Sequence, residues 1–149
     1  MLKWVTLSTF IVFFCFVATT WGYSSLPTIE IGLKDGTTVT AELAVTKHER
    51  QRGLMYRDGL RSGEGMLFVF NEEDRYPVWM KNVDFPIDII WINSDFRVVD
   101  AQTAAPCTDY CRNYLPEYPA MYVLEVPSGF ADAHGIETGS PVDISAYNG

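Results

Sequence analysis

The sequence contains few histidines, few cysteines and few basic side chains. Its 149 residues include 2 histidines, 3 cysteines, and 11 Lys and Arg against 19 Asp and Glu, which gives a net charge of −8. A domain of this sign repels phosphates, and no run of Lys and Arg with interleaved aromatics offsets the balance. We therefore expect no nucleic-acid partner and attribute the acidity to solubility.

Motifs for covalent hydrolysis and for phosphate binding are also missing. The chain has no Gly-x-Ser-x-Gly turn. The glycine-rich stretch 58–65 lacks the Lys-Ser/Thr ending of a phosphate-binding loop, so it is predicted to be a plain connection.

Metal ligands are present but are not spaced as a metal site. A four-ligand set would consist of His48, His134, Cys107 and Cys111. The histidines have no ligand spacing to each other or to the cysteines. Four methionines could attract copper, but core packing explains their apolar surroundings; they are Met55, Met66, Met80 and Met121. We predict no metal and no other cofactor.

The N-terminal segment is apolar and differs from the rest of the chain. Lys3 is the only charge before Glu30, and residues 5–18 are almost wholly apolar. This pattern predicts a signal peptide over residues 1–22. The alternative is an uncleaved membrane anchor over residues 4–23, close to the ~20 residues needed to cross a bilayer. Either reading predicts an exported protein, periplasmic or extracellular, that touches the membrane only through this segment.

Two cysteines remain once Cys15 is removed with the signal. An even pair in an exported chain predicts a disulfide between Cys107 and Cys111. The pair lies in the proline-bearing segment 106–119, where the backbone is free to bring the two Cα atoms into bridging range. So short a ring stabilises by about 2 kcal/mol and mainly fixes the shape of the loop.

The remaining length suits one domain, residues 26–146. Thr46 and Glu49 form a capping box, which predicts a helix of about three turns, and Ser128 is predicted to cap a second helix over 129–134. Alternating or continuous apolar runs predict strands at 28–33, 38–43, 66–70, 87–92, 96–101, 120–126 and 141–145.

Five motifs occur in an order and spacing typical of one family. They are RGLMYR at 52–57, GMLFVF at 65–70, WMKN at 79–82, PIDI at 86–89 and LEVPSG at 124–129. Over roughly residues 28–145 the chain resembles the family called domain of unknown function 192. The resemblance implies an α+β domain with a curved, partly closed antiparallel sheet, barrel-like, and two short helices. It implies no reaction, substrate or cofactor.

Two carboxylates are predicted on buried strands. Asp88 and Glu125 each lie among apolar residues, and two carboxylates that face one cleft can serve as acid and base on a glycosidic bond. The structural alternative, which we favour, is that each carboxylate pairs with an arginine, with Arg52 and Arg57 as the partners.

The loop between the two most apolar strands is the first candidate for a binding site. Trp79 could stack on a sugar ring while Lys81 and Asn82 bind its hydroxyls, with Arg52 and Arg57 nearby. Alternatively, Trp79 and its neighbour Met80 fill one end of the barrel.

These observations favour a binding or accessory module over an enzyme. We expect an extracellular or cell-envelope protein whose ligand is a carbohydrate or cell-wall fragment. Two alternatives remain: a small glycosidase-like hydrolase that uses Asp88 and Glu125, and a structural domain that binds another protein.

Overall fold

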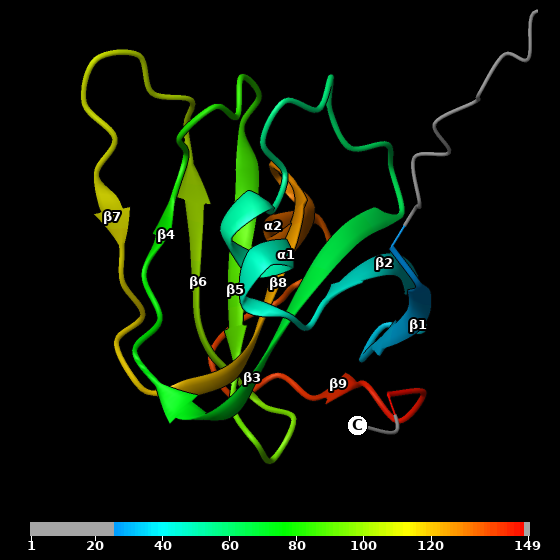
Figure 1. Ribbon diagram of the computed structural model, residues 1–149. Helices are drawn as coiled ribbons and strands as arrows, with labels where there is room; N and C mark the ends of the chain where they lie inside the picture. The colour runs from blue at the N-terminus through cyan, green and yellow to red at the C-terminus, as the bar shows by residue number, and fades with distance from the viewer. Residues whose placement is uncertain (1–25, 148–149) are drawn as a thin grey trace, which may run out of the picture.

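The computed structural model of the protein describes residues 26–147. The predicted signal peptide or anchor lies outside these residues. Within residues 26–147, none of the helices has the length and apolar character needed to cross a membrane. The elements, in chain order, are β1 (Thr28–Leu33), β2 (Thr38–Ala44), α1 (Lys47–Arg52), β3 (Glu64–Asp74), β4 (Val78–Trp79), β5 (Ile87–Ile92), β6 (Val98–Ala104), β7 (Asn113–Tyr114), β8 (Ala120–Pro127), α2 (Phe130–Ala133) and β9 (Val142–Asp143) (Figure 1).

Seven strands form one sheet in the order β6-β5-β8-β3-β2-β1-β9. Neighbouring strands are antiparallel except β2 and β3, which run parallel because α1 and the following loop carry the chain back to the same end of the sheet. All seven predicted strands are present: β1 and β5 have the predicted ends, and the other five have shifted ends. The short pair β4 and β7 forms a separate two-stranded sheet that the sequence did not predict.

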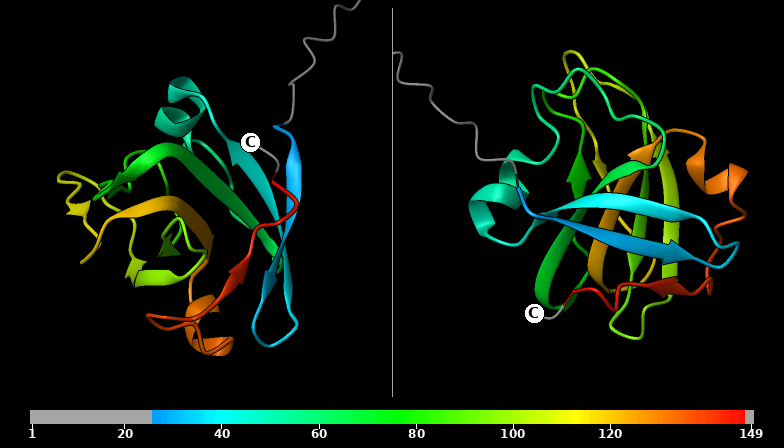
Figure 2. Two further views of the ribbon diagram at one scale, coloured as in Figure 1. Left: turned by 90° about the horizontal axis from the view of Figure 1, so that it is seen from below. Right: turned by 90° about the vertical axis from the view of Figure 1, so that its right-hand side faces the viewer.

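The large sheet curls until its two ends meet. Arg97, just before β6, forms a bridge with Pro141, just before β9. The Val142 N–H also donates to the Phe96 carbonyl at 3.0 Å. These contacts join the two edges of the sheet at one end, and the views in Figure 2 show the resulting curl. The predicted α+β class with a curved, partly closed sheet is confirmed, with one parallel pair added.

Alternation along the strands sends side chains to two separate cores. Residues of all seven strands fill the inside of the curl, among them Ile31, Leu67, Ile90 and Leu124. The outer face carries a second core, which includes Leu54, Phe68, Ile89, Trp91 and Val123. Strand β5 is buried at every position because both of its faces are covered. The two helices lie on opposite sides of the sheet (Figure 2).

Helix α1 begins as predicted but is shorter than three turns. The capping box is present: the Thr46 hydroxyl accepts from the Glu49 N–H, and the Glu49 carboxylate accepts from the Thr46 N–H. The helix ends at Arg52 because Gly53 adopts a positive φ of 46°. A Cβ on Gly53 would also lie 3.2 Å from the Phe68 ring, so the chain turns where only glycine fits.

Helix α2 is capped by a side chain of strand β5, which is distant from it in sequence. Ser128, the predicted cap, is exposed, and the N-cap position is Gly129, which makes no side-chain cap bond. Instead, the Asp88 carboxylate on β5 accepts from the Ala131 N–H at 2.9 Å and from the Thr103 hydroxyl at 2.8 Å. The predicted arginine partner of Asp88 is therefore wrong. This buried acid is satisfied by a helix end and a hydroxyl.

We predict that Asp88→Ala destabilises the fold by about 2 to 4 kcal/mol, because it leaves a buried N–H and a hydroxyl without their acceptor. Chemical denaturation measures the change. Asp84→Ala, at an exposed position beside β5, is the matched control and should stay within about 0.5 kcal/mol of the natural protein. Equal effects of the two substitutions would contradict the capping role of Asp88.

Candidate functional site

A cleft of about 570 Å³ opens on the outer face of the sheet, in the size range of small-ligand sites. It lies between α1, strands β3 and β8, and residues 76–83, and we call it the α1–β4 cleft. Its lining residues are Lys47, Arg50, Gln51, Arg52, Gly53, Leu54, Met55, Phe68, Phe70, Asn71, Glu72, Tyr76, Pro77, Val78, Trp79, Lys81, Val83, Ile87, Val123 and Glu125.

Glu125 lies at the floor of the cleft. Its cross-strand neighbours are Met66 on β3 and Ile89 on β5, and neither has any exposed surface. Glu125 itself is 5% exposed. Its carboxyl group is therefore surrounded by apolar side chains and separated from bulk water.

This burial raises the pKa of Glu125 to about 8, since the charged form loses its hydration. Arg57 opposes the shift through its charge, but its guanidinium is bound to Glu42 at 2.5 and 2.8 Å. Of the two predicted partners, Arg57 therefore forms its ion pair with Glu42 and acts on Glu125 through its charge. Within residues 26–147 no fully buried side-chain polar atom lacks a partner. Glu125 is one of the residues that line the cleft.

The two carboxylates proposed as an acid and base lie on opposite faces of the sheet. Asp88 pairs across the strands with Val126, whose side chain lies inside the curl. Glu125 pairs with Ile89, which belongs to the outer core. Directly paired residues point to the same face of a sheet, so the carboxylates are separated by the sheet itself. They cannot flank one glycosidic bond.

One wall of the cleft is a stack of planar groups. The rings of Phe70 and Tyr76 lie parallel with their centroids 3.5 Å apart, and the Arg50 guanidinium lies 4.8 Å from the Phe70 centroid. Arg50 also donates to the Val45 carbonyl and, at 2.8 Å, to the Val69 carbonyl. These bonds hold Arg50, and with it α1, against β3.

Trp79 stands at the mouth of the cleft. Its side chain is 47% exposed, and the Lys81 ammonium lies 5.1 Å from its ring centroid. Its neighbour Met80 is 1% exposed and belongs to the outer core. The loop thus combines the two readings of the sequence: Met80 fills the core, while Trp79 and Lys81 face the cleft.

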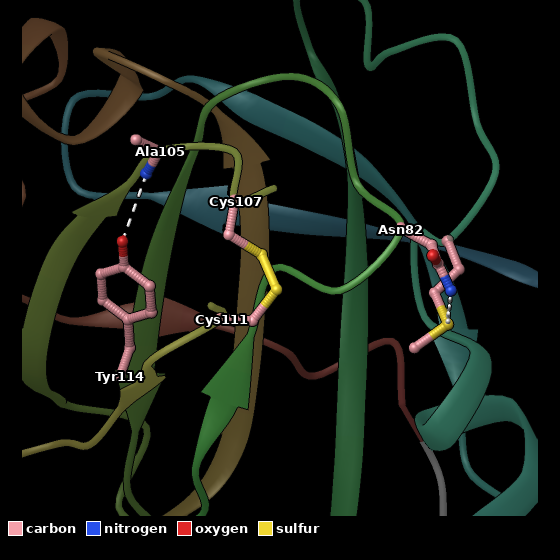
Figure 3. Close-up of a disulfide and its surroundings, with 6 residues drawn as sticks. Asn82, Ala105, Cys107, Cys111 and Tyr114 are labelled. Atoms are coloured by element: carbon pink, nitrogen blue, oxygen red, sulfur yellow. Dashed lines mark hydrogen bonds between the residues drawn. A yellow bond between two sulfur atoms is a disulfide. The ribbon is translucent and has the colours of Figure 1, made fainter. Parts of the chain in front are cut away.

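The predicted disulfide between Cys107 and Cys111 is present, with the two Cα atoms 5.3 Å apart (Figure 3). It closes the turn that leads into β7, where Asn113 pairs with Trp79 on β4. The Tyr114 hydroxyl accepts from the Ala105 N–H at 3.3 Å and holds the other end of this turn (Figure 3). The disulfide therefore supports the strand that presents Trp79.

Asn82 fixes the other side of the same loop rather than lining the cleft. Its side-chain amide donates to the Tyr56 hydroxyl at 2.8 Å and to the Met55 sulfur at 3.8 Å, while its backbone carbonyl accepts from the Tyr56 N–H at 2.9 Å. Asn82 and Tyr56 both have positive φ, a conformation that asparagine tolerates better than tyrosine. These bonds join the loop that follows α1 to the loop that carries Trp79.

The residues weighed as metal ligands are separated or already occupied. The His134 Nδ1 lies 2.7 Å from the Asp35 carboxylate and 3.2 Å from the Thr37 hydroxyl, and both cysteines are in the disulfide. Among residues 26–147, His, Cys, Asp and Glu side chains form no cluster that could hold a metal ion.

Sequence analysis identified Trp79, Lys81, Arg52 and Glu125, and the structure brings all four to the α1–β4 cleft. It missed Lys47, Arg50 and Phe70. The capping box placed both basic residues on one short helix, and their spacing of three put them on one face. Nothing local indicated that this face meets β3, because that contact depends on the parallel pairing of β2 and β3.

We predict that the Glu125 carboxyl titrates near pH 8 rather than near its ordinary 4.5, as measured by carbon-13 NMR. In this range the folded state keeps a proton that the unfolded state has lost, so stability falls as pH rises from about 4.5 to about 8. Glu125→Gln should not lose stability in this way. Between pH 4.5 and pH 8 its free energy of unfolding should therefore rise by about 4 kcal/mol relative to that of the natural protein.

Glu117→Gln, at an exposed position, is the control for this comparison and should follow the natural protein at both pH values. A Glu125 that titrates near 4.5 would mean that water hydrates the floor of the cleft.

We also predict that the double substitution Cys107→Ser, Cys111→Ser increases hydrogen exchange in residues 76–83 while the β1–β2 hairpin stays protected. The reason is that β4 depends on β7 for its backbone pairing, and β7 follows the disulfide directly. Loss of the ring should cost about 2 kcal/mol of stability. Unchanged exchange in residues 76–83 would show that the disulfide does not support Trp79.

The fold and the sequence of this chain are similar to those of proteins without an assigned function. A crystal structure of a protein of unknown function from Novosphingobium aromaticivorans superimposes with a TM-score of 0.74 at 32% identity, covering 82% of this chain and 89% of that one. A UPF0127 protein from Thermococcus gammatolerans is 36% identical over 100 residues, which are 66% of this chain and 61% of the relative.

A second UPF0127 protein, from Pyrococcus furiosus, is 31% identical over 100 residues, covering 64% of this chain and 78% of the relative. The chain thus spans only about three fifths of the Thermococcus protein's length. Residues 30–144 match the family described as "Uncharacterized ACR". The resemblance seen in the sequence motifs is confirmed, and the protein belongs to the family of domain of unknown function 192.

Proposed function

We propose that the protein is a small-ligand binding module and that the α1–β4 cleft holds a carbohydrate or cell-wall fragment. The observation that carries this proposal is Trp79, a half-exposed indole at the mouth of an apolar cleft. Exposing such a ring to water is unfavourable, and sugar rings present the C–H faces that an indole can cover. Lys81 and Glu125 supply polar groups at the mouth and at the floor.

Binding is favoured over hydrolysis by the positions of the carboxylates. A glycosidase needs an acid and a second carboxylate on opposite sides of one bond. Asp88, the other carboxylate considered for catalysis, lies on the opposite face of the sheet and caps α2. Glu125 by itself can bind a hydroxyl group but cannot perform both roles.

We place this binding activity outside the cytosol, in the periplasm or on the cell surface. The disulfide supports this location, because such bonds persist in oxidising compartments. The apolar segment 5–18 supports it as well, since it has the composition of a signal peptide or anchor. Sugars and cell-wall fragments are available as ligands in the same compartments.

The test is tryptophan fluorescence of the protein titrated with neutral and acidic glycans. A bound sugar should change the emission of Trp79, and Trp79→Ala should weaken binding by at least about tenfold, since stacking on an aromatic ring contributes on the order of 1 kcal/mol or more. Calorimetry with the same glycans gives the affinity of the variant independently of its fluorescence.

The matched control is Tyr118→Ala, which removes another exposed aromatic that does not line the cleft. It should bind glycans like the natural protein, and both variants should unfold at the same temperature as the natural protein. If no glycan binds the natural protein, or if Trp79→Ala binds as well as Tyr118→Ala does, the proposed function is wrong.

A further inference from the structure

The α1–β4 cleft gathers positive charge in a protein whose net charge is −8. Its lining includes four basic side chains, Lys47, Arg50, Arg52 and Lys81, and two acidic ones, Glu72 and Glu125. Elsewhere on the chain the acids predominate. A concave surface lined mainly by one sign of charge concentrates the field and attracts ligands of the opposite sign.

The basic groups surround the aromatic surfaces of the cleft. Lys81 lies over the Trp79 ring, and Arg50 lies over the Phe70 ring, which also lines the cleft. Lys47 is one helical turn before Arg50 on the same face of α1. A flat ligand stacked on Trp79 therefore lies in a cleft whose aromatic surfaces carry cations.

The floor of the cleft does not cancel this charge. Burial keeps Glu125 protonated at neutral pH, because its pKa is raised to about 8. A protonated carboxyl donates one hydrogen bond and repels no anion. It is more than nine-tenths buried and lines the cleft, so its donor faces a group that enters there.

We propose that the ligand of the α1–β4 cleft is an anionic saccharide, whose ring stacks on Trp79, whose negative group lies among Lys47, Arg50 and Lys81, and whose innermost oxygen accepts from Glu125. This inference rests on the proposed carbohydrate-binding function and narrows its substrate class. Carboxylate and phosphate groups share the chemistry that the basic side chains recognise, since both are compact anions with several acceptor oxygens.

The experiment is a glycan array of matched pairs, in which one sugar is neutral and its partner carries a carboxylate or a phosphate. Calorimetry is then performed on the pairs that bind. Anionic members should bind at least tenfold more tightly than their neutral partners, and added salt should reduce this preference. The arm that binds more tightly, carboxylated or phosphorylated, identifies the anionic group.

The double substitution Lys47→Gln, Lys81→Gln tests the residues assigned to the anion. It should weaken binding of the anionic member of a pair far more than binding of the neutral member, and so remove most of the preference for the anion. Lys34→Gln, which removes an exposed lysine in the β1–β2 turn outside the cleft, is the control and should keep the full preference.

The outcomes separate this inference from the proposed function. Neutral sugars that bind as tightly as their anionic partners, or a double variant that keeps the preference, would overturn the anionic ligand and leave sugar binding in place. An array on which no glycan binds would overturn both. Free inorganic phosphate that binds as tightly as a phosphorylated sugar would show that the site recognises the anion alone, which contradicts a role for the Trp79 stack.

Discussion

The alternation of side chains along β5 and β8 is the constraint on which the rest of the structure depends. Both strands are central in the sheet and covered on both faces, so every side chain must enter one of two apolar cores. A carboxylate on either strand therefore needs a specific solution. Asp88, on the inner face, accepts from the Ala131 N–H of α2 and from a threonine hydroxyl, whereas Glu125, on the outer face, lines the cleft.

The two acids illustrate two ways in which a protein accommodates a buried polar group. Asp88 accepts hydrogen bonds from the Ala131 N–H and the Thr103 hydroxyl, which would lack an acceptor without it. Its burial therefore stabilises the end of α2 and the edge strand β6 together. Glu125 has apolar neighbours, and Arg57, whose charge acts on it, is paired with Glu42. Its burial costs stability at neutral to alkaline pH, and strongly shifted carboxyls of this kind are concentrated at functional sites.

The cleft is assembled from segments that are far apart in sequence. Arg50 links α1 to β3, Asn82 links the loop after α1 to the Trp79 loop, and the disulfide supports β7, which pairs with β4. Each of these bonds joins segments that border the cleft or support its walls. Such support allows Trp79 to remain half exposed without becoming loose, which is what a pre-formed ligand site requires.

The sequence by itself determined the local elements and the chemistry of individual positions. Alternation identified the seven strands of the sheet, the capping box identified the start of α1, and cysteine pairing identified the disulfide. These features depend on neighbouring residues, so their signals are readable along the chain. Sequence motifs also identified the family and, through it, the curved sheet.

Only the tertiary structure decided how these positions combine. The end of α1 depends on Phe68 lying against Gly53, the cap of α2 comes from Asp88 on β5, and the short strands β4 and β7 exist only because they meet. The separation of Asp88 from Glu125 likewise follows from which face of β5 is paired with which face of β8. All four depend on contacts between residues distant in sequence, and local periodicity carries no information about them.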